Sequence, residues 1–223
     1  MIDPKDLARR GFEKALMSQQ ALAVANVGRL RRIHPEMSPH ELLRYLDRAY
    51  LIAVTTSGGA AGATALVPGA GMPGALVDMA AFTEVSVLYV LSCAEVHGLH
   101  SEDLERRRLL VLTVLMGDSA TGALRKAVGR TGPHWARRIV TAIPMTTINR
   151  LNTLLGPRFI TKYGTKQGLL VLSKQVPLGI GVLLGGAGNH MIGRGVLASA
   201  RKVFDEPPDS WDPAPPASGR TTR

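Results

Sequence analysis

Cys93, His97 and His100 have the residue types and the spacing of a possible metal site. Cys93 and His97 are four residues apart and so share one face of a helix, and His100 follows within one turn. A structural zinc site needs about four convergent ligands. Gly98 is expected to end the helix before His100, and the other histidines are scattered along the chain. We therefore predict no metal site and no cofactor here.

Two carboxylates, Glu84 and Glu95, form a second candidate site. They are eleven residues apart, which is three helical turns, so they share one helix face. Paired carboxylates can act as general acid and general base. A salt link from such a carboxylate to one of the many arginines is the commoner arrangement, and it is the one we expect.

A serine nucleophile at Ser119 is the third candidate. Gly117, Asp118 and Ser119 have the composition of an esterase turn, but the segment follows a predicted helix and lacks the G-x-S-x-G elbow. Asp118 or Ser119 is therefore expected to cap the next helix. We predict that the protein is not an enzyme. A hydrolase using Ser119 or the Glu84/Glu95 face is an alternative.

The Gly-rich segment TTSGGAAGATALVPGAGMPG contains a G-x-G-x-x-G sequence at Gly69–Gly74. A dinucleotide-binding loop of this kind follows a strand, and its backbone amides bind phosphate. Here a predicted helix precedes the motif, and two prolines remove amide donors. We expect a helical hairpin instead. Gly58 and Gly62 would lie on one helix face and allow close packing, and Pro68 would belong to the turn.

A second series of small residues recurs at intervals of four near the C-terminal end. Its members form one stripe along a helix and invite a close helix neighbour. They are Gly181, Gly185, Asn189 and Gly193. Asn189 is predicted to form a hydrogen bond across this contact as a structural clamp rather than to act in catalysis.

Helical periodicity and helix start signals predict an all-α protein that forms a single helical bundle with Gly/Pro-rich helical hairpins. Ser38 to Glu41 form a capping box with Pro39 at the first helical position. No alternating strand pattern persists along the chain. The predicted parts are an N-terminal amphipathic helix and linker (residues 1–37), a helical domain (38–204) and a disordered Pro-rich tail (205–223).

The body of the protein is strongly basic. The chain has 27 basic and 17 acidic side chains, for a net charge of +10, and its last nineteen residues are net acidic. A basic body attracts anions. Aromatic residues make up only 4%, and no DNA-binding module is present, which argues against nucleic acid. Basic clusters beside apolar helices fit an anionic membrane surface. The predicted membrane-surface residues are Arg106, Arg107 and Arg108.

Two long stretches carry no charged side chain. Residues 49–77 form a stretch of 29, and residues 175–193 a stretch of 19. A helix that spans a membrane needs about 20 apolar residues. Glycines and prolines interrupt both stretches, so we predict buried or membrane-dipping hairpins rather than two spanning helices. Tight core helices of a soluble bundle would use the same glycines, and both interpretations stay open.

The chain also resembles the EcsC family of bacterial proteins. The run AAGATALVPGAGMPGALVDMAAFTEVSVLYVLSCAEVHGLH is similar to the first half of that family, and KQVPLGIGVLLGGAGNHMIGRGVLASARKVF to its second half, over roughly residues 40–204. His97-Gly98 departs from the aromatic-Gly pair expected there. The resemblance implies a helical, membrane-associated protein. The family is named for a component encoded with an ABC-type transporter and carries no transferable catalytic set.

The sequence therefore predicts a non-enzymatic, membrane-associated helical protein that assists or regulates an ABC-type transport or secretion system. Its expected partners are an anionic lipid surface and a transporter or other membrane protein, and not nucleic acid. The single Cys and the absence of an apolar segment in MIDPKDLARR predict the cytoplasmic side of the cell membrane, with peripheral or partly inserted binding. The main alternative is a helical protein that binds lipid or another apolar ligand.

Overall fold

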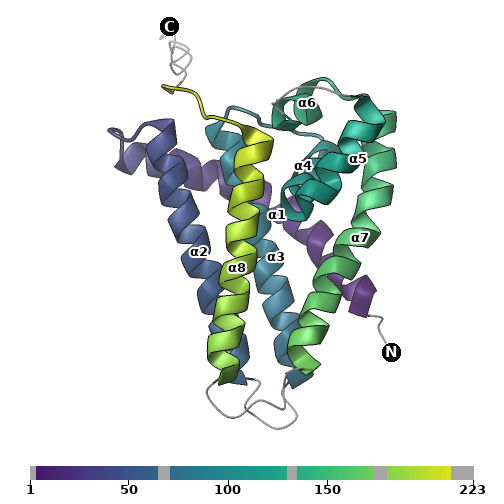
Figure 1. The fold of residues 1–223 in the computed structure, drawn as a ribbon. Coiled ribbons are helices and arrows are strands. Elements are labelled where there is room, and N and C mark those ends of the chain that lie inside the picture. The colour runs from purple at the N-terminus through teal and green to yellow at the C-terminus, as the bar shows by residue number, and fades with distance from the viewer. Residues whose placement is uncertain (1–3, 65–70, 130–134, 173–179, 212–223) are drawn as a thin grey trace, which may run out of the picture.

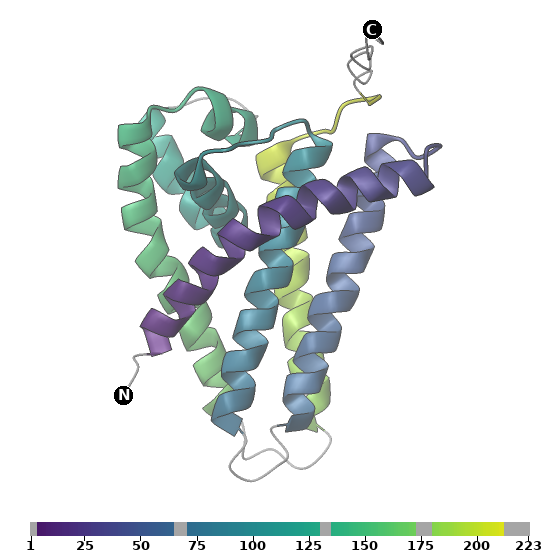
Figure 2. The ribbon, with the colours of Figure 1, turned by 180° about the vertical axis from the view of Figure 1, so that it is seen from behind.

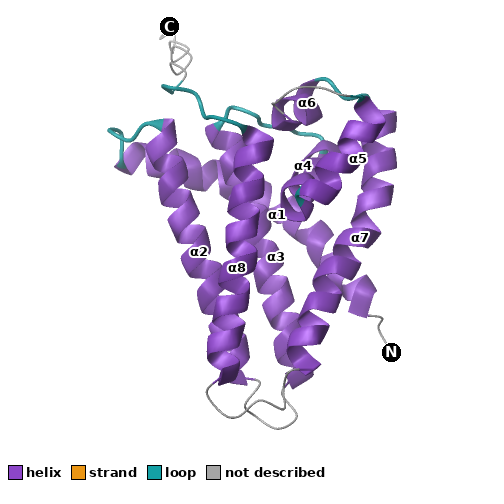
Figure 3. Ribbon diagram, viewed as in Figure 1, coloured by secondary structure: helices purple, strands orange, loops and turns teal. Residues whose placement is uncertain are grey.

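The protein is helical throughout the part of the chain that its structure, a computed structural model, describes. The backbone is described over residues 4–64, 71–129, 135–172 and 180–211, and the side chains over 9–56, 81–129, 135–161 and 187–211. These ranges contain no strand, and the predicted all-α class is confirmed (Figure 3). The helices are α1 (Pro4–Ile33), α2 (Pro39–Thr64), α3 (Gly71–Val96), α4 (Leu104–Met116), α5 (Asp118–Val128), α6 (Trp135–Thr141), α7 (Met145–Leu172) and α8 (Ile180–Phe204).

Four long helices, α2, α3, α7 and α8, run along the length of the molecule (Figure 1). α2 packs against both α8 and α3, and α4 packs against α7. α1 crosses the back of α3 diagonally, as Figure 2 shows. The short helices α4, α5 and α6 lie in the upper half of the view in Figure 1, beside α7. This arrangement brings the C-terminal ends of α3 and α8 close to α6 and to the start of α2.

Local sequence signals explain where several helices begin and end. The backbone N of Ser38 donates to Oε2 of Glu41 at 2.9 Å, and N of Glu41 donates to Oγ of Ser38 at 3.3 Å, so the predicted capping box forms. The carboxylate of Asp103 caps α4 by accepting two backbone N–H groups. α3 and α4 end beside Gly98 and Gly117, whose positive φ values of 65° and 60° favour glycine.

α4 is the central helix of the upper half. Its residues Leu109–Met116 are all buried, because α3, α5, α6, α7 and α8 contact it. A helix that is apolar on every face must be enclosed. This explains why the run LLVLTVL has no amphipathic period. The buried hydroxyl of Thr113 is satisfied within the helix, since it donates to O of Leu109 at 2.6 Å.

α1 contributes its apolar face to the same core. It packs along α3, and the ring of Phe12 lies 5.0 Å from the ring of Phe159 in α7, measured between centroids. In the structure the N-terminal helix is therefore part of the helical body. Its buried apolar residues are Phe12, Ala15, Leu16, Ala23, Val27 and Leu30.

Residues 205–211 also pack on the body, which differs from the disorder expected from Asp205 onward. Nε1 of Trp211 donates to O of Met37 at 2.8 Å. The guanidinium carbon of Arg31 lies 4.2 Å from the centroid of the Trp211 ring. A Pro-rich, polar composition indicates disorder on average, but one aromatic ring with a hydrogen-bond donor can anchor such a segment. The rest of the predicted tail lies outside the described residues.

Candidate functional site

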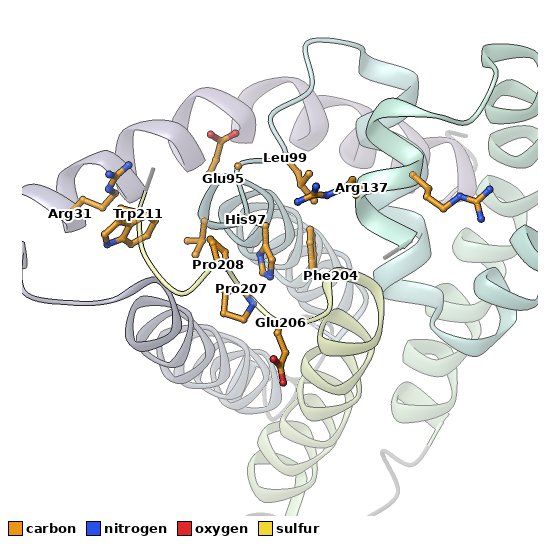
Figure 4. A pocket seen from close by; sticks show the side chains of 13 residues that line it. Arg31, Glu95, His97, Leu99, Arg137, Phe204, Glu206, Pro207, Pro208 and Trp211 are labelled. Carbon is orange, nitrogen blue, oxygen red and sulfur yellow. The ribbon is translucent and has the colours of Figure 1, made fainter. Parts of the chain in front are cut away.

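Two adjoining cavities lie at the end of the molecule where α3 and α8 terminate. The first, the α6 cavity, has a volume of about 650 Å³ and is lined by the end of α3, by α6 and by the segment after α8 (Figure 4). The second, the α2 cavity, has about 470 Å³ and is lined by α2, α3 and α8. Both volumes lie within the range of small-ligand sites, about 300–1,000 Å³. Four residues line both cavities and form a shared wall: His97, Phe204, Glu206 and Pro207.

His97 connects the end of α3 to the segment that leaves α8. Its Nδ1 lies 2.7 Å from O of Cys93, and its Nε2 lies 3.4 Å from O of Asp205. The imidazole stacks on Phe204, with ring centroids 5.0 Å apart. Burial lowers the pKa of His97, so the ring is neutral near pH 7. A neutral ring has a single N–H to donate, and the shorter distance favours O of Cys93 as its acceptor; this hydrogen bond and the stacking on Phe204 fit a structural role in the shared wall.

Several polar side chains are linked along the α2 cavity. Arg201 donates to Oδ2 of Asp47 at 3.0 Å, and the hydroxyl of Tyr89 donates to Oδ1 of Asp47 at 2.7 Å. The Tyr89 ring stacks on Tyr50, with centroids 4.5 Å apart. Burial raises the pKa of the Tyr89 hydroxyl and of the Cys93 thiol, so both are protonated at neutral pH. Because a protonated thiol is a poor nucleophile, this wall is suited to binding rather than to covalent chemistry.

The candidate metal ligands have separate partners. His100 lies between two carboxylates: its Nδ1 is 2.6 Å from Oε1 of Glu95, and its Nε2 is 2.7 Å from Oε1 of Glu102. Hydrogen bonds to Glu102 and Glu95 raise the pKa of His100 from its ordinary value of 6.5. The protonated ring therefore stabilises the fold below pH 6.5, and this contribution is lost as the pH rises through the raised pKa. Within the described residues, no group of three or more His, Cys, Asp or Glu side chains is arranged so that it could hold a metal ion.

Glu84 and Glu95 do not share a site. Glu84 is exposed, whereas Glu95 is half-buried and accepts a hydrogen bond from Nε2 of Gln20 in α1 at 2.8 Å. Eleven residues of one helix separate the two by about 16 Å along its axis. The carboxylates of acid–base pairs lie within about 10 Å of each other. Glu95 pairs with His100 rather than with the arginine that the sequence led us to expect.

Ser119 is exposed in the first turn of α5. Gly117 is the N-cap residue, and no side-chain hydrogen bond caps this helix, so the expected cap by Asp118 or Ser119 is wrong. The carboxylate of Asp118 instead accepts a hydrogen bond from Nζ of Lys202 at 3.4 Å. No histidine in the described ranges is hydrogen-bonded to Ser119.

The three consecutive arginines at the start of α4 bind groups inside the protein. All three are only partly exposed, and they connect α4 to α1 and α6. Their predicted position on an exposed membrane surface is therefore corrected: they hold helices together. The partners are O of Ile139 at 2.6 Å for Arg106, O of Leu16 at 3.1 Å for Arg107, and the carboxylates of Glu13 at 3.1 Å and Glu105 at 3.2 Å for Arg108.

Two of the predicted helix-packing residues have described surroundings. A Cβ atom added to Gly193 would lie 2.9 Å from Cγ2 of Val54 and 3.2 Å from Cδ2 of Leu51, so α8 approaches α2 closely at this point. Asn189, one turn earlier, is buried. The surroundings of the other five lie outside the described side chains: Gly58, Gly62, Pro68, Gly181 and Gly185.

The two uncharged stretches meet at the end of the molecule opposite the cavities. α2 and α7 end there, and α3 and α8 begin there (Figure 1). None of the helices, over the residues described, is both long enough and apolar enough to cross a membrane. We call this region the uncharged end. It consists of the last turns of α2 and the first turns of α3 and α8, which belong to the uncharged stretches 49–77 and 175–193.

Comparisons of the chain with protein-family models, with curated proteins and with solved structures gave no significant match.

The charged side chains are distributed asymmetrically along the chain, a feature that the separate basic clusters did not reveal. Residues 119–204 contain thirteen basic side chains and no acidic one. They form α5, α6, α7 and α8, so one side of the helical body is positive wherever these side chains reach solvent. Counting acids along the chain, rather than bases, would have found this segment. Its exposed cations include Arg125, Lys126, Arg150, Arg158 and Arg194.

The docked segment after α8 makes a testable contribution to stability. A chain ending at Phe204 is expected to be less stable than a chain ending at Trp211 by about 1–2 kcal/mol. The loss combines one partly buried hydrogen bond, worth about 1 kcal/mol, with a cation–π contact of about 0.5–1 kcal/mol. Thermal unfolding of the two truncated chains and the full chain measures this difference. Equal melting temperatures for the two truncated chains would show that the Trp211 contacts do not stabilise the body.

Proposed function

We propose that the protein is a non-enzymatic, membrane-associated helical protein whose uncharged end enters the interfacial region of an anionic bilayer. The observation that supports this proposal is the meeting of two uncharged stretches, far apart in the sequence, at one end of the molecule (Figure 1). Moving ionised side chains out of water is costly, whereas uncharged helix ends avoid that cost. This end is therefore the part of the molecule best suited to contact lipid.

Positive charge along the helices that reach the uncharged end supports the same orientation. The acid-free segment 119–204 supplies basic residues on α7 and α8. Each Lys or Arg near an anionic lipid surface contributes about 1 kcal/mol of attraction, and salt weakens this attraction. The basic residues on these helices that lie closest to the uncharged end are Lys162 and Lys166, in the last three turns of α7.

The resemblance to the EcsC family supports a role beside a membrane protein such as an ABC-type transporter, on the cytoplasmic side of the cell membrane. In the proposed orientation the uncharged end faces the bilayer, and the α6 and α2 cavities face away from it. The cavities would then remain open to the cytoplasm, where a ligand or a partner protein could reach them.

Flotation with lipid vesicles tests the proposal. The protein is expected to float with vesicles that contain phosphatidylglycerol and to bind pure phosphatidylcholine vesicles more weakly. Changing Leu66 and Val67 to Glu places two carboxylates in the connection between α2 and α3. This double variant is expected to bind at least about tenfold more weakly, a loss of about 1.4 kcal/mol or more, because each carboxylate must lose water and approach anionic lipid.

The matched control is Ile33→Glu at the opposite end of the molecule. Ile33 is an exposed apolar side chain at the end of α1, with an exposed fraction of 54%. This variant should float like the parent. Equal flotation of the Leu66/Val67 variant and the parent, with both folded by circular dichroism, would contradict insertion through the uncharged end.

A further inference from the structure

The α6 cavity contains cations that are not neutralised within the protein. Arg137 and Arg138 in α6 line it, and neither has a carboxylate partner among the residues that the structure describes. Of the two carboxylates in the lining, Glu95 is already bound by His100 and Gln20, and Glu206 is exposed. The α6 side of the cavity therefore has an excess of positive charge.

The opposite side of the cavity is apolar and aromatic. Figure 4 shows side chains from three sources around the space: the end of α3, the end of α8 and the segment that follows α8. Aromatic rings and prolines offer broad apolar faces to a ligand without adding many rotatable side chains. The apolar lining residues are Val96, Leu99, Phe204, Pro207, Pro208 and Trp211.

We propose that the α6 cavity binds an anionic amphiphile: a carboxylate attached to a medium-length alkyl chain. The carboxylate would pair with one of the two guanidiniums of α6, because a guanidinium matches the two oxygens of a carboxylate, and the second arginine would add positive charge beside it. The alkyl chain would lie between Phe204 and Trp211. The volume of about 650 Å³ fits a ligand of this size. This inference is independent of membrane binding, since the cavity lies at the end opposite the uncharged end.

Isothermal titration calorimetry of the full-length protein with decanoate, in the absence of vesicles, tests the proposal. Decanoate should bind saturably at pH 8, where its carboxylate is ionised. Decanol has the same chain without the charge, and inorganic phosphate has charge without the chain. Each should bind at least about tenfold more weakly than decanoate, because a hydrogen bond to a charged group contributes about 1.5–3 kcal/mol.

Changing Arg137 and Arg138 together to Gln should weaken decanoate binding by about tenfold or more and leave decanol binding unchanged. The matched control changes Arg125 and Lys126 to Gln; both are exposed on α5 and lie outside the cavity lining. This control should bind decanoate like the parent. Quenching of tryptophan fluorescence by a brominated decanoate, reduced by Trp211→Phe with Trp135 as the remaining fluorophore, would locate the chain in the cavity.

Three results would overturn the proposal. Decanol binding as tight as decanoate binding would make the cavity an apolar site without anion recognition. Phosphate binding as tight as decanoate binding would make it a simple anion site. Equal decanoate affinity in the parent and in the Arg137/Arg138 variant would place the ligand elsewhere. Arg137 is exposed and Arg138 is half-exposed, so the Arg137/Arg138 variant is expected to fold like the parent.

Discussion

Replacing Arg106, Arg107 and Arg108 together by Glu should prevent stable folding. The new carboxylates would face the carbonyl oxygens of Leu16 and Ile139 and the carboxylates that now pair with Arg108. Each lost hydrogen bond to a charged group costs about 1.5–3 kcal/mol, and repulsion adds to this loss. The sum is comparable with the whole stability of a typical domain, about 5–15 kcal/mol. Far-UV circular dichroism and urea unfolding measure the effect.

The control for this experiment reverses the charge of two basic residues that are exposed on α7. Arg150→Glu together with Arg158→Glu should change stability by no more than about 0.5 kcal/mol per site, as exposed substitutions usually do. A triple Arg106/Arg107/Arg108 variant that unfolds at the same urea concentration as the parent would show that these three contacts do not hold α4 in place.

Gly193→Leu should destabilise the protein by about 2–4 kcal/mol, because overpacking a tight contact costs about 1–3 kcal/mol and a long branched side chain adds to that. The first added carbon would already lie 2.9 Å from Cγ2 of Val54, which is fully buried and belongs to a stiff β-branched side chain. The gain in helix propensity on replacing glycine is only about 0.8–1 kcal/mol and does not offset the clash. Urea unfolding measures the difference.

Gly195, two residues further along α8, provides the matched control. A Cβ atom there would meet nothing within 4 Å, and the residue is exposed. Gly195→Leu should therefore leave stability unchanged or raise it by up to about 0.8 kcal/mol through helix propensity alone. If the variants at Gly193 and Gly195 unfold alike, α8 does not pack closely on α2 at this point.

Features that depend on neighbouring residues were predictable from the sequence. The capping box at Ser38 starts α2, Gly98 follows the end of α3, and the spacing of apolar residues in α1 marks its buried face. α4 begins at Leu104. Asp103 takes the N-cap position there, because its carboxylate reaches two amides of the first turn. Helix boundaries of this kind shift by a few residues for such local reasons.

Features that depend on distant residues were not predictable in the same way. The partners of Arg106 and Arg107 are backbone carbonyls in α6 and α1, so a run of arginines looked like a solvent-facing cluster. Trp211 sits in a polar, Pro-rich context, and its partner carbonyl at Met37 is 174 residues away in the chain. The α6 cavity was missed for the same reason, since it requires α3, α6 and the segment after α8 to meet.

An environment-sensitive fluorophore on the uncharged end tests membrane insertion most directly. Leu66→Cys labelled with a nitrobenzoxadiazole dye reports from the connection between α2 and α3, and Ile33→Cys reports from the opposite end. Labelling should be selective, because the native thiol of Cys93 is buried and burial raises its pKa.

On adding phosphatidylglycerol vesicles, the dye at position 66 is expected to shift its emission to shorter wavelength and to be quenched by lipids with nitroxide-labelled acyl chains. The dye at position 33 should keep the emission of a water-exposed group. The proposed orientation would be contradicted if the dye at position 66 kept the emission of a water-exposed group while the protein was bound to vesicles. A shift to shorter wavelength at position 33 instead of position 66 would contradict it as well.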